Sequence, residues 1–497
     1  MVAPLPTTIP PVLEPQRWGL TDAQLDQLGQ RLCACWSRYR DCFTTRTRDT
    51  SPLAHVYLKG LLLLPNERNY ANIARRLIGP EDDGQALQNF MSDSPWRDDD
   101  VFARIQQDIA VCPDLRGGAL LLDESGDPRA GDQSAGAARQ YLGRLGKVDM
   151  GQVGVGLSYV HQGLWTLVDA ELYLPREWFG PTYADLRRRL HIPGERTFAT
   201  KGELGLQLIR QARARGLPFR VVVADAVYGN DSKLRAALAA DGEPYVMDVP
   251  CHYPVYLERP TVGVPPCAPG QRGRPCTQPR LLSSAASVRV DSLLAQVQWR
   301  RVRVRSGERG TIWRDAWAVR VWTISASWAV REEWLLVHRE PGGVIHYSLS
   351  NLAEATPLEV LVQERCERYW VERTFQEEKS ELGWDELVAR KYRAWQHHAA
   401  LTALALWLLM QMRRDCRVEP AAEQQLAAEL GVEKLPALSV ANLRELLVAV
   451  LPLPQLTPQQ ARALVIRQLN QRVRSTRSRL QQERREMAGT AAAPESS

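Results

Sequence analysis

The segment Phe-Arg-Val-Val-Val-Ala-Asp at residues 219–225 is the strongest strand signal in the chain, and it constrains the fold more than any other segment. Its β-branched run predicts a buried strand that ends in Asp225. Capping and stop signals predict a helix over about residues 200–216, and a second helix is expected near 232–240, before a strand at 245–250. This strand–helix–strand order predicts an α/β domain whose site lies at the carboxyl ends of its strands.

A second apolar run also ends in acidic residues. Residues 117–125 (GGALLLDES) place three leucines behind two glycines and end at Asp123 and Glu124. Neighbouring side chains of a strand point to opposite faces, so we expect only one of these two carboxylates to enter a site. Asp127 is a third, weaker candidate. Two further strands are predicted at 152–160 and 164–174, joined by a turn.

Changes in amino-acid composition and hydrophobic pattern divide the rest of the chain into regions. Residues 251 to about 283 are rich in Pro, Gly and Arg, and several strands are expected from 286 to 349 before helical patterns return. The predicted organisation is a Pro-rich leader (1–17), a helical N-terminal region (18–112), the first part of an α/β core (113–250), a β-rich insertion (251–349), the second part of that core (350–413) and a helical C-terminal region (414–497).

Composition excludes several classes of protein. With 44% hydrophobic and 24% charged residues, the chain is not disordered, collagen-like or a coiled coil. Nine cysteines without a Cys-x-x-Cys pair favour a reducing cytosol. The longest apolar run, Ala399 to Met410, is too short for a membrane span and predicts a buried helix, which His397 and His398 are expected to cap. We therefore expect a cytoplasmic protein without membrane association.

Basic charge is concentrated near the C-terminus. Residues 457–487 contain eight arginines and two glutamates, an excess equal to the net charge of +6 of the whole chain. This segment predicts a basic amphipathic helix that suits a polyanion, with Arg472, Arg474 and Arg477 as candidate DNA contacts. The alternative is a solvated helix docked on a partner subunit.

A third acidic position lies in a predicted helix, RYWVERTFQEEKSELGWDE (368–386). At 100° per residue, Arg368, Glu372 and Lys379 share one face of this helix. An Arg368–Glu372 ion pair on a solvated face would explain part of the pattern. However, carboxylates from two strand ends and one packed helix can also converge, and oxygen ligands of this kind suit divalent cations in phosphodiester chemistry.

These motifs resemble the DDE transposases of bacterial insertion sequences, which belong to the RNase H-like nuclease superfamily. The resemblance extends over about residues 50 to 410. In a related group of these enzymes the third motif reads Tyr-x2-Arg-x3-Glu-x6-Lys, which Arg368, Glu372 and Lys379 match, whereas Arg365 stands at the tyrosine position and Tyr369 lies nearby. The supporting stretches are residues 120–131, 134–155, 217–229 and 368–386.

The resemblance implies an RNase H-like core with a β-rich insertion before the glutamate. It implies that Asp123, rather than Glu124, joins Asp225 and Glu372 in holding two Mg²⁺ ions, with Mn²⁺ as a substitute. Arg368 and Lys379 would contact DNA phosphates. The implied function is cleavage at the ends of an insertion sequence and transfer of the 3′-hydroxyl into target DNA, by a homodimer on double-stranded DNA whose N-terminal helices bind the element ends.

Further features leave alternatives open. Arg139 and Lys147 lie among glycines after the first carboxylate and could hold the DNA backbone, or could belong to a surface β-connection. A tryptophan of the β-rich region could stack on an extruded base, although such residues usually pack within sheets. Two other functions remain possible at this stage: a non-catalytic DNA-binding regulator derived from a transposase, and a repair or junction nuclease on the same fold.

Overall fold

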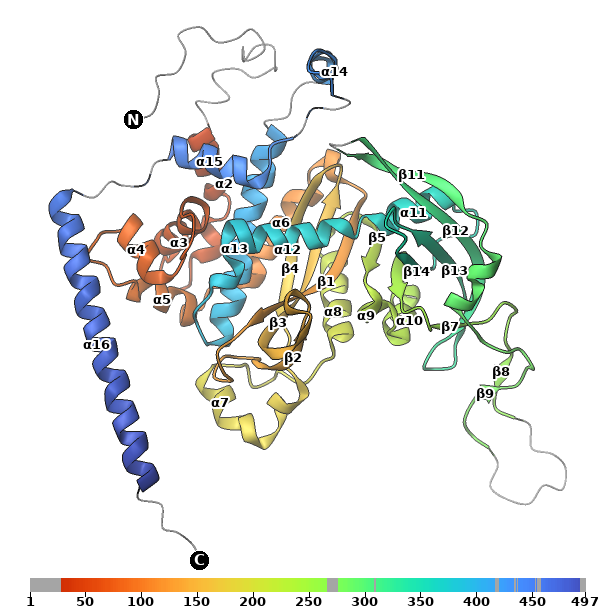
Figure 1. Cartoon of the computed structure of the whole chain (residues 1–497), viewed down its shortest axis with the longest axis horizontal. Helices are drawn as coiled ribbons and strands as arrows, with labels where there is room; N and C mark the ends of the chain where they lie inside the picture. The colour runs from red at the N-terminus through yellow and green to blue at the C-terminus, as the bar shows by residue number, and fades with distance from the viewer. Residues whose placement is uncertain are drawn as a thin grey trace, which may run out of the picture.

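The computed structural model describes residues 28–265, 276–307, 310–415, 420–432, 435, 437–451, 453 and 457–491. The predicted Pro-rich leader (1–17) lies outside these residues. Figure 1 shows the N-terminal helices at one end of the molecule, a twisted sheet in the middle and the β-rich insertion at the other end.

A mixed sheet forms the centre of the molecule. Strand β5 (Phe219–Ala224) pairs in parallel with β1 (Gly118–Pro128) and with β6 (Tyr245–Val249). On the other side of β1, β3 (Lys147–His161) pairs antiparallel with both β1 and β4 (Leu164–Leu172). This arrangement confirms the predicted α/β class and its RNase H-like core.

The insertion extends the same sheet. Strands β11 (Arg300–Gly307), β12 (Gly310–Ile324), β13 (Val330–Arg339) and β14 (Ile345–Ser350) form an antiparallel meander, and β14 pairs with β6. The result is one ten-stranded sheet that joins core and insertion. Shorter strands are β2 (Ala138–Leu142), β7 (Pro254–Val255), β8 (Val262–Gly263), β9 (Arg280–Leu281) and β10 (Val288–Arg289).

Helices with clear local signals cover the core strands. Helix α8 (Lys201–Ala214) starts with the predicted capping box, in which Thr200 and Glu203 each bond to the other's backbone N–H. Helix α12 (Tyr369–Leu382) ends at Gly383, whose φ of 72° suits glycine. The other helices around the core are α7 (Ala184–Arg189), α9 (Ala226–Gly229), α10 (Ser232–Ala240), α11 (Leu358–Cys366) and α13 (Tyr392–Asp415).

The N-terminal helices share one hydrophobic core with the sheet and with α13. They are α2 (Leu28–Ser37), α3 (Ser51–Leu63), α4 (Tyr70–Leu77), α5 (Gln85–Ser92) and α6 (Asp98–Ala110). Burial of their apolar faces against α13 therefore attaches this region firmly to the part of the molecule that contains the central sheet.

The expectation that His397 and His398 cap a helix is wrong. Helix α13 begins at Tyr392, so both histidines lie inside it and are buried. The ring nitrogens of His397 lie 2.9 Å from the carbonyl oxygens of Met91 and Trp96. The pair therefore satisfies buried backbone carbonyls from neighbouring segments, a role that depends on tertiary packing.

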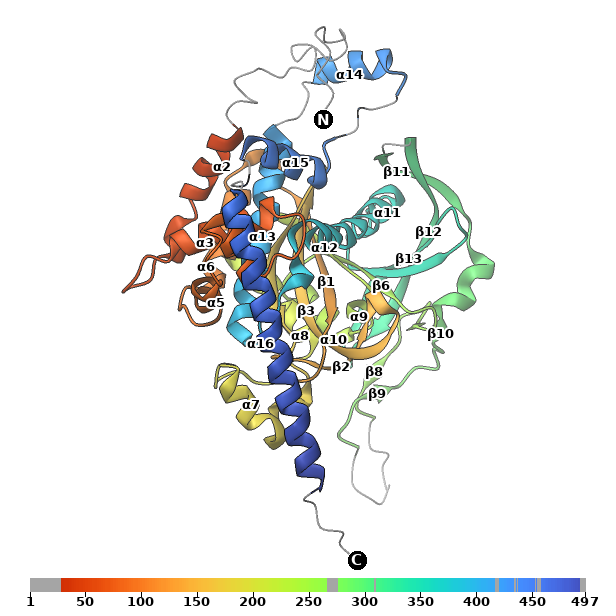
Figure 2. The ribbon, with the colours of Figure 1, turned by 60° about the vertical axis from the view of Figure 1, so that its left-hand side comes forward.

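Among the described residues after α13, the helices are α14 (Pro420–Glu429), α15 (Val440–Val450) and α16 (Pro458–Ala491). Figure 1 shows α16 apart from α4 and α5, and with this side turned forward in Figure 2 it lies in front of the body. Within the ranges that the structure describes, no helix combines the length and apolar character needed to cross a membrane.

Candidate active site

Asp123 of β1 and Asp225, which follows β5, are neighbours because of the register of the central sheet. Strands β1 and β5 pair in parallel with Leu122 opposite Ala224. The next residues, Asp123 and Asp225, therefore stand side by side where β5 ends. The expectation that the first strand also ends at Asp123 is wrong, because pairing with β3 continues β1 to Pro128. The carboxyl end of β5 lies at the edge where α/β folds place their sites.

The two carboxylates are buried close together, which makes it unfavourable for both to carry a negative charge. Burial and the negative charge of Asp225 raise the pKa of Asp123 to about 7, while Arg368 acts in the opposite direction. Burial also raises the pKa of Asp225, although the N–H groups of Val227 and Tyr228 donate to its carboxylate at 2.9 and 3.4 Å. Two adjacent, poorly solvated carboxylates are a donor set that fits a divalent cation.

One face of α12 runs along β1 and contacts it twice. At the start of the helix, Nη2 of Arg368 lies 4.0 Å from Oδ2 of Asp123 and 3.2 Å from Oε1 of Glu372. Near its end, Nζ of Lys379 lies 2.8 Å from Oδ1 of the buried Asp127. The predicted common face is thus directed at β1, and the Arg368 guanidinium bridges a strand carboxylate and a helix carboxylate.

Glu372 lies at the open side of this arrangement. Its side chain is 60% exposed, whereas that of Asp123 is 13% exposed. Among the residues that the structure describes, the ligand oxygens of Asp123, Asp225 and Glu372 do not all come within 4.8 Å of one another. Arg368 connects Glu372 to the aspartates and balances their charge.

Strand alternation separates the acidic residues of β1. Glu124 points to the opposite face from Asp123, where its Oε1 lies 2.6 Å from Nζ of Lys201 at the start of α8. Asp127 shares the face of Asp123, but Lys379 and the indole N–H of Trp384 hold it in a buried position. The geometry favours Asp123 as the carboxylate from β1.

Sequence reasoning missed a third acidic residue at this edge, Asp248 on β6. Arg365 donates two hydrogen bonds to its carboxylate, at 3.1 and 2.7 Å, and the hydroxyl of Ser348 donates a third at 2.6 Å. Burial acts to raise the pKa of Asp248, but Arg365 outweighs it and the net pKa is lowered. Arg365, at the family's tyrosine position, therefore fixes β6 beside the site. The sequence feature that could have indicated Asp248 is its position near the end of the strand predicted at residues 245–250.

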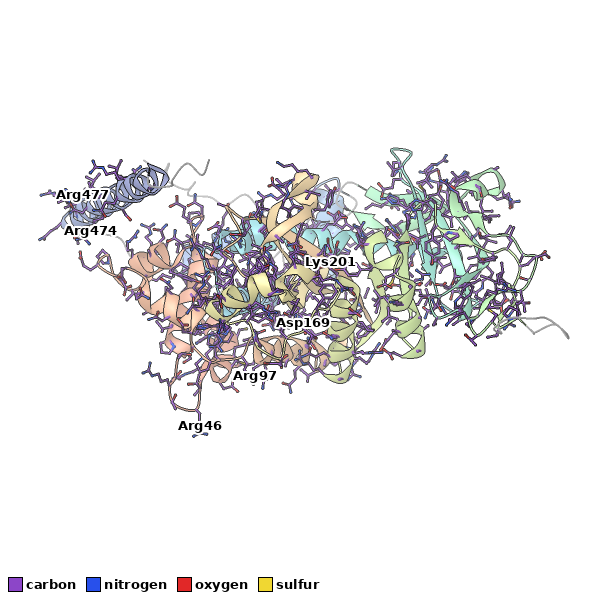
Figure 3. All side chains as sticks on the ribbon, turned by 90° about the horizontal axis from the view of Figure 1, so that it is seen from below. Arg46, Arg97, Asp169, Lys201, Arg474 and Arg477 are labelled. Atoms are coloured by element: carbon purple, nitrogen blue, oxygen red, sulfur yellow. The ribbon has the colours of Figure 1, made fainter. Side chains whose placement is uncertain are left out.

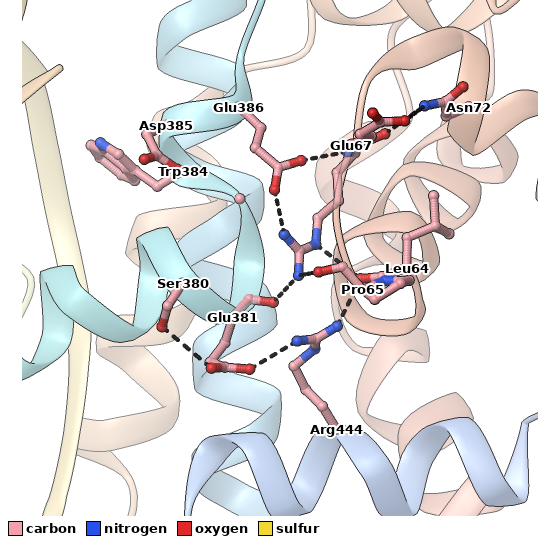
Figure 4. Close-up of polar contacts among 12 residues, drawn as sticks. Leu64, Pro65, Glu67, Asn72, Ser380, Glu381, Trp384, Asp385, Glu386 and Arg444 are labelled. Atoms are coloured by element: carbon pink, nitrogen blue, oxygen red, sulfur yellow. Dashed lines mark hydrogen bonds and ion pairs between the residues drawn. The ribbon is translucent and has the colours of Figure 1, made fainter. Parts of the chain in front are cut away.

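The far end of α12 is anchored to the N-terminal helices (Figure 4). Arg68 is buried, and its Nη1 lies 2.7 Å from Oε1 of Glu386 while its Nη2 donates to the carbonyl oxygen of Glu381 at 2.7 Å. Arg444 of α15 pairs with the Glu381 carboxylate at 2.8 Å. These contacts set the position of the helix that carries Glu372.

A cavity of about 1220 Å³ opens beside the start of α12, on the side away from β1. It is basic and aromatic, and the Arg305 guanidinium lies 4.7 Å from the ring centres of both Tyr369 and Trp370. Trp313, one of the tryptophans of the β-rich insertion, lines this cavity. Its arginines are Arg301, Arg305, Arg314, Arg339, Arg373 and Arg413.

The remaining predicted DNA contacts lie away from the acidic edge. Arg139 is exposed on β2, and Lys147, at the start of β3, pairs with Asp149 at 2.9 Å. The three arginines predicted on the C-terminal helix, Arg472, Arg474 and Arg477, are exposed on α16. Figure 3 shows Arg474 and Arg477 at one end of the molecule, well separated from Lys201 at the start of α8. The structure does not bring α16 to the acidic residues.

Comparison with known proteins gives two findings. A sequence model of the family described as DDE superfamily endonuclease matches residues 38–311, a span that contains Asp123 and Asp225 and ends before Glu372. A protein of Microchaete diplosiphon, described as a probable transposase for insertion sequence element IS701, is 27% identical over 315 residues, which is 63% of this chain and 70% of the relative.

Proposed function

The chain belongs to the DDE superfamily endonucleases, whose sequence model matches more than half of it, and on this premise we propose that it is an insertion-sequence transposase. It would cut DNA at the element ends and join the resulting 3′-hydroxyl to target DNA. The observation that carries this proposal is the pairing of Asp123 and Asp225 at one sheet edge, with Arg368 between them and Glu372.

Enzymes of this family generally use divalent metal ions. We assign two Mg²⁺ ions, for which Mn²⁺ can substitute, to Asp123, Asp225 and Glu372. Burial and the neighbouring charge of Asp225 raise the pKa of Asp123, and this supports the assignment, because a bound cation would stabilise the charged carboxylates. When bound, the ions would activate the attacking oxygen and neutralise charge on the phosphate.

The protein's own groups position the phosphate. Arg368 sits where a phosphate would meet the carboxylates, and its guanidinium can bind two phosphate oxygens at once. The backbone N–H of Glu124 donates to Oδ1 of Asp123 at 2.7 Å, which orients that carboxylate. Lys379 is engaged with Asp127, so we assign it the positioning of β1 and assign phosphate contact to Arg368.

Several surfaces support DNA as the partner. The cavity beside α12 combines arginines with aromatic rings, and exposed basic residues lie on β2, on β3 and along α16. We propose that the N-terminal helices bind the element ends and that a homodimer in the cytoplasm joins two ends at once. Because phosphate contacts release counterions, binding should weaken steeply as the salt concentration rises.

The test is metal-dependent cleavage of DNA that carries the terminal sequences of the element. Asp225→Asn should abolish cleavage. Asp231→Asn is the matched control, because Asp231 also caps a helix with its carboxylate but lies outside the site. Cleavage that survives Asp225→Asn would overturn the assignment. Hydrolysis without joining to a second duplex would favour a repair or junction nuclease, and binding without cleavage a regulator.

A further inference from the structure

A second group of ligand-type side chains lies on the insertion hairpin formed by β13 and β14. His338 and His346 are directly opposite each other in the antiparallel pair, and Glu340 follows His338 at the end of β13. One ligand atom from each of these three residues lies within 4.8 Å of the others. We call this group the hairpin cluster.

His338 is the residue that needs explanation. Its side chain is fully buried, and neither ring nitrogen has a hydrogen-bond partner among the described residues. Buried imidazoles normally donate through one nitrogen and accept through the other, so a residue with both unsatisfied points to a missing ligand.

The surroundings permit a cation to reach the cluster. Glu340 and Arg314 both line the cavity beside α12, which provides an entry path. Arg314 lies 3.8 Å from the Glu340 carboxylate and is partly exposed, so it can turn away into the cavity. Two further arginines act on these histidines: Arg365 forms a bidentate pair with Asp248, and Arg368 pairs with Glu372.

We propose that the hairpin cluster binds a transition-metal ion of the zinc type, separate from the carboxylate site of the core. Two neutral imidazoles and one carboxylate are a ligand set that favours Zn²⁺ over Mg²⁺. The two rings are stacked, with planes 12° apart and centres 4.9 Å apart, so both cannot aim at one ion as they stand. His346 is partly exposed and turns to complete the site, while burial fixes His338. The bound ion cross-links β13 to β14.

The experiment measures Zn²⁺ binding to the full chain by isothermal titration after treatment with a chelator, with Co²⁺ as a spectroscopic probe. Wild-type protein should bind one Zn²⁺ through this cluster and show a higher melting temperature in its presence. His346→Ala should weaken that binding by roughly tenfold or more and remove the shift in melting temperature. Its ring is partly exposed, so the variant should fold; Glu340→Gln provides an independent second test.

Two controls separate this site from others. His252→Ala removes an exposed histidine outside the cluster and should bind Zn²⁺ like the wild type. Asp225→Asn should lose DNA cleavage but keep Zn²⁺ binding and the Co²⁺ spectrum, so this inference and the proposed function fail independently. Zn²⁺ binding that is unchanged in both His346→Ala and Glu340→Gln, or no binding by the wild type, would overturn the proposal.

Discussion

Glu372 and Glu378 lie less than two turns apart on α12 but occupy opposite environments. The Glu372 side chain is 60% exposed and pairs with Arg368 beside the aspartates of the sheet. Glu378 is fully buried against α13, and burial raises the pKa of its carboxyl group well above the usual value. The first is available as a charged ligand, whereas the second is held neutral in the core.

This difference continues along the whole helix. The first half of α12 faces the acidic edge and the cavity, and its charged groups are open to a substrate. The second half is fixed by the Lys379–Asp127 pair and by the contacts of Arg68. One helix therefore combines a reactive end with a structural end, and substitutions at the two ends should have different consequences.

The largest expected effect is at the reactive end. Glu372→Gln should lower the rate of DNA cleavage by about 10³-fold, because it removes a charged ligand from the site. Its free energy of unfolding should stay within about 0.5 kcal/mol of wild type, since the side chain is exposed. Cleavage assays measure the rate, and urea unfolding measures the stability. A loss of stability large enough to account for the loss of cleavage would contradict the prediction.

The next effect is at the structural end. Arg68→Ala should lower the free energy of unfolding by about 3–5 kcal/mol, because it leaves Glu386 and a backbone carbonyl without their buried partner. Arg46→Ala, at an exposed arginine labelled in Figure 3, is the control and should be nearly neutral. Similar unfolding curves for the two variants would show that the anchor does not hold α12.

A smaller effect distinguishes the two roles considered for Lys379. Lys379→Met should lower the free energy of unfolding by about 2–3 kcal/mol, because Asp127 then lacks its charged partner. Adding Asp127→Asn should recover part of that stability. The slope of the logarithm of the DNA-binding constant against the logarithm of the salt concentration should be unchanged in both variants. A slope smaller in magnitude by about one would instead support direct phosphate contact by Lys379.

The smallest effect depends on pH. Because the folded-state pKa of Glu378 is raised, its contribution to stability is present below the ordinary pKa of 4.5 and is lost as the pH rises through the folded value. Glu378→Gln should therefore change stability by less than about 1 kcal/mol at pH 5 and become relatively more stable at alkaline pH. Parallel curves of stability against pH for variant and wild type would contradict this.

The sequence allowed prediction of the parts that depend on local order. The apolar run before Asp225 indicated a strand with an acidic carboxyl end, and β5 ends directly before that residue. The apolar run before Asp123 also indicated a strand, and β1 pairs in parallel with β5, but β1 continues past Asp123 to Pro128. Helical periodicity placed Arg368, Glu372 and Lys379 on one face. Periodicity defines a face, however, and does not show what the face contacts.

The parts that could not be predicted depend on distant pairings. Asp248 meets Arg365 only because β14 joins β6 and α11 packs over them, and the insertion extends the core sheet through the same pairing. The partner of Lys379 depends on how far β1 continues beyond Asp123. Such contacts join segments far apart in the chain, which local patterns do not relate.

The central claim is that Asp123, Asp225 and Glu372 share one metal site, and metal-directed cleavage of the polypeptide tests it most directly. Fe²⁺ would replace Mg²⁺, and peroxide would generate radicals that cut the backbone near the bound ion. We expect cuts near residues 123, 225 and 372, all of which disappear together in Asp225→Asn and persist in Asp231→Asn. Cuts that spare one of these three regions, or that survive Asp225→Asn, would contradict the account.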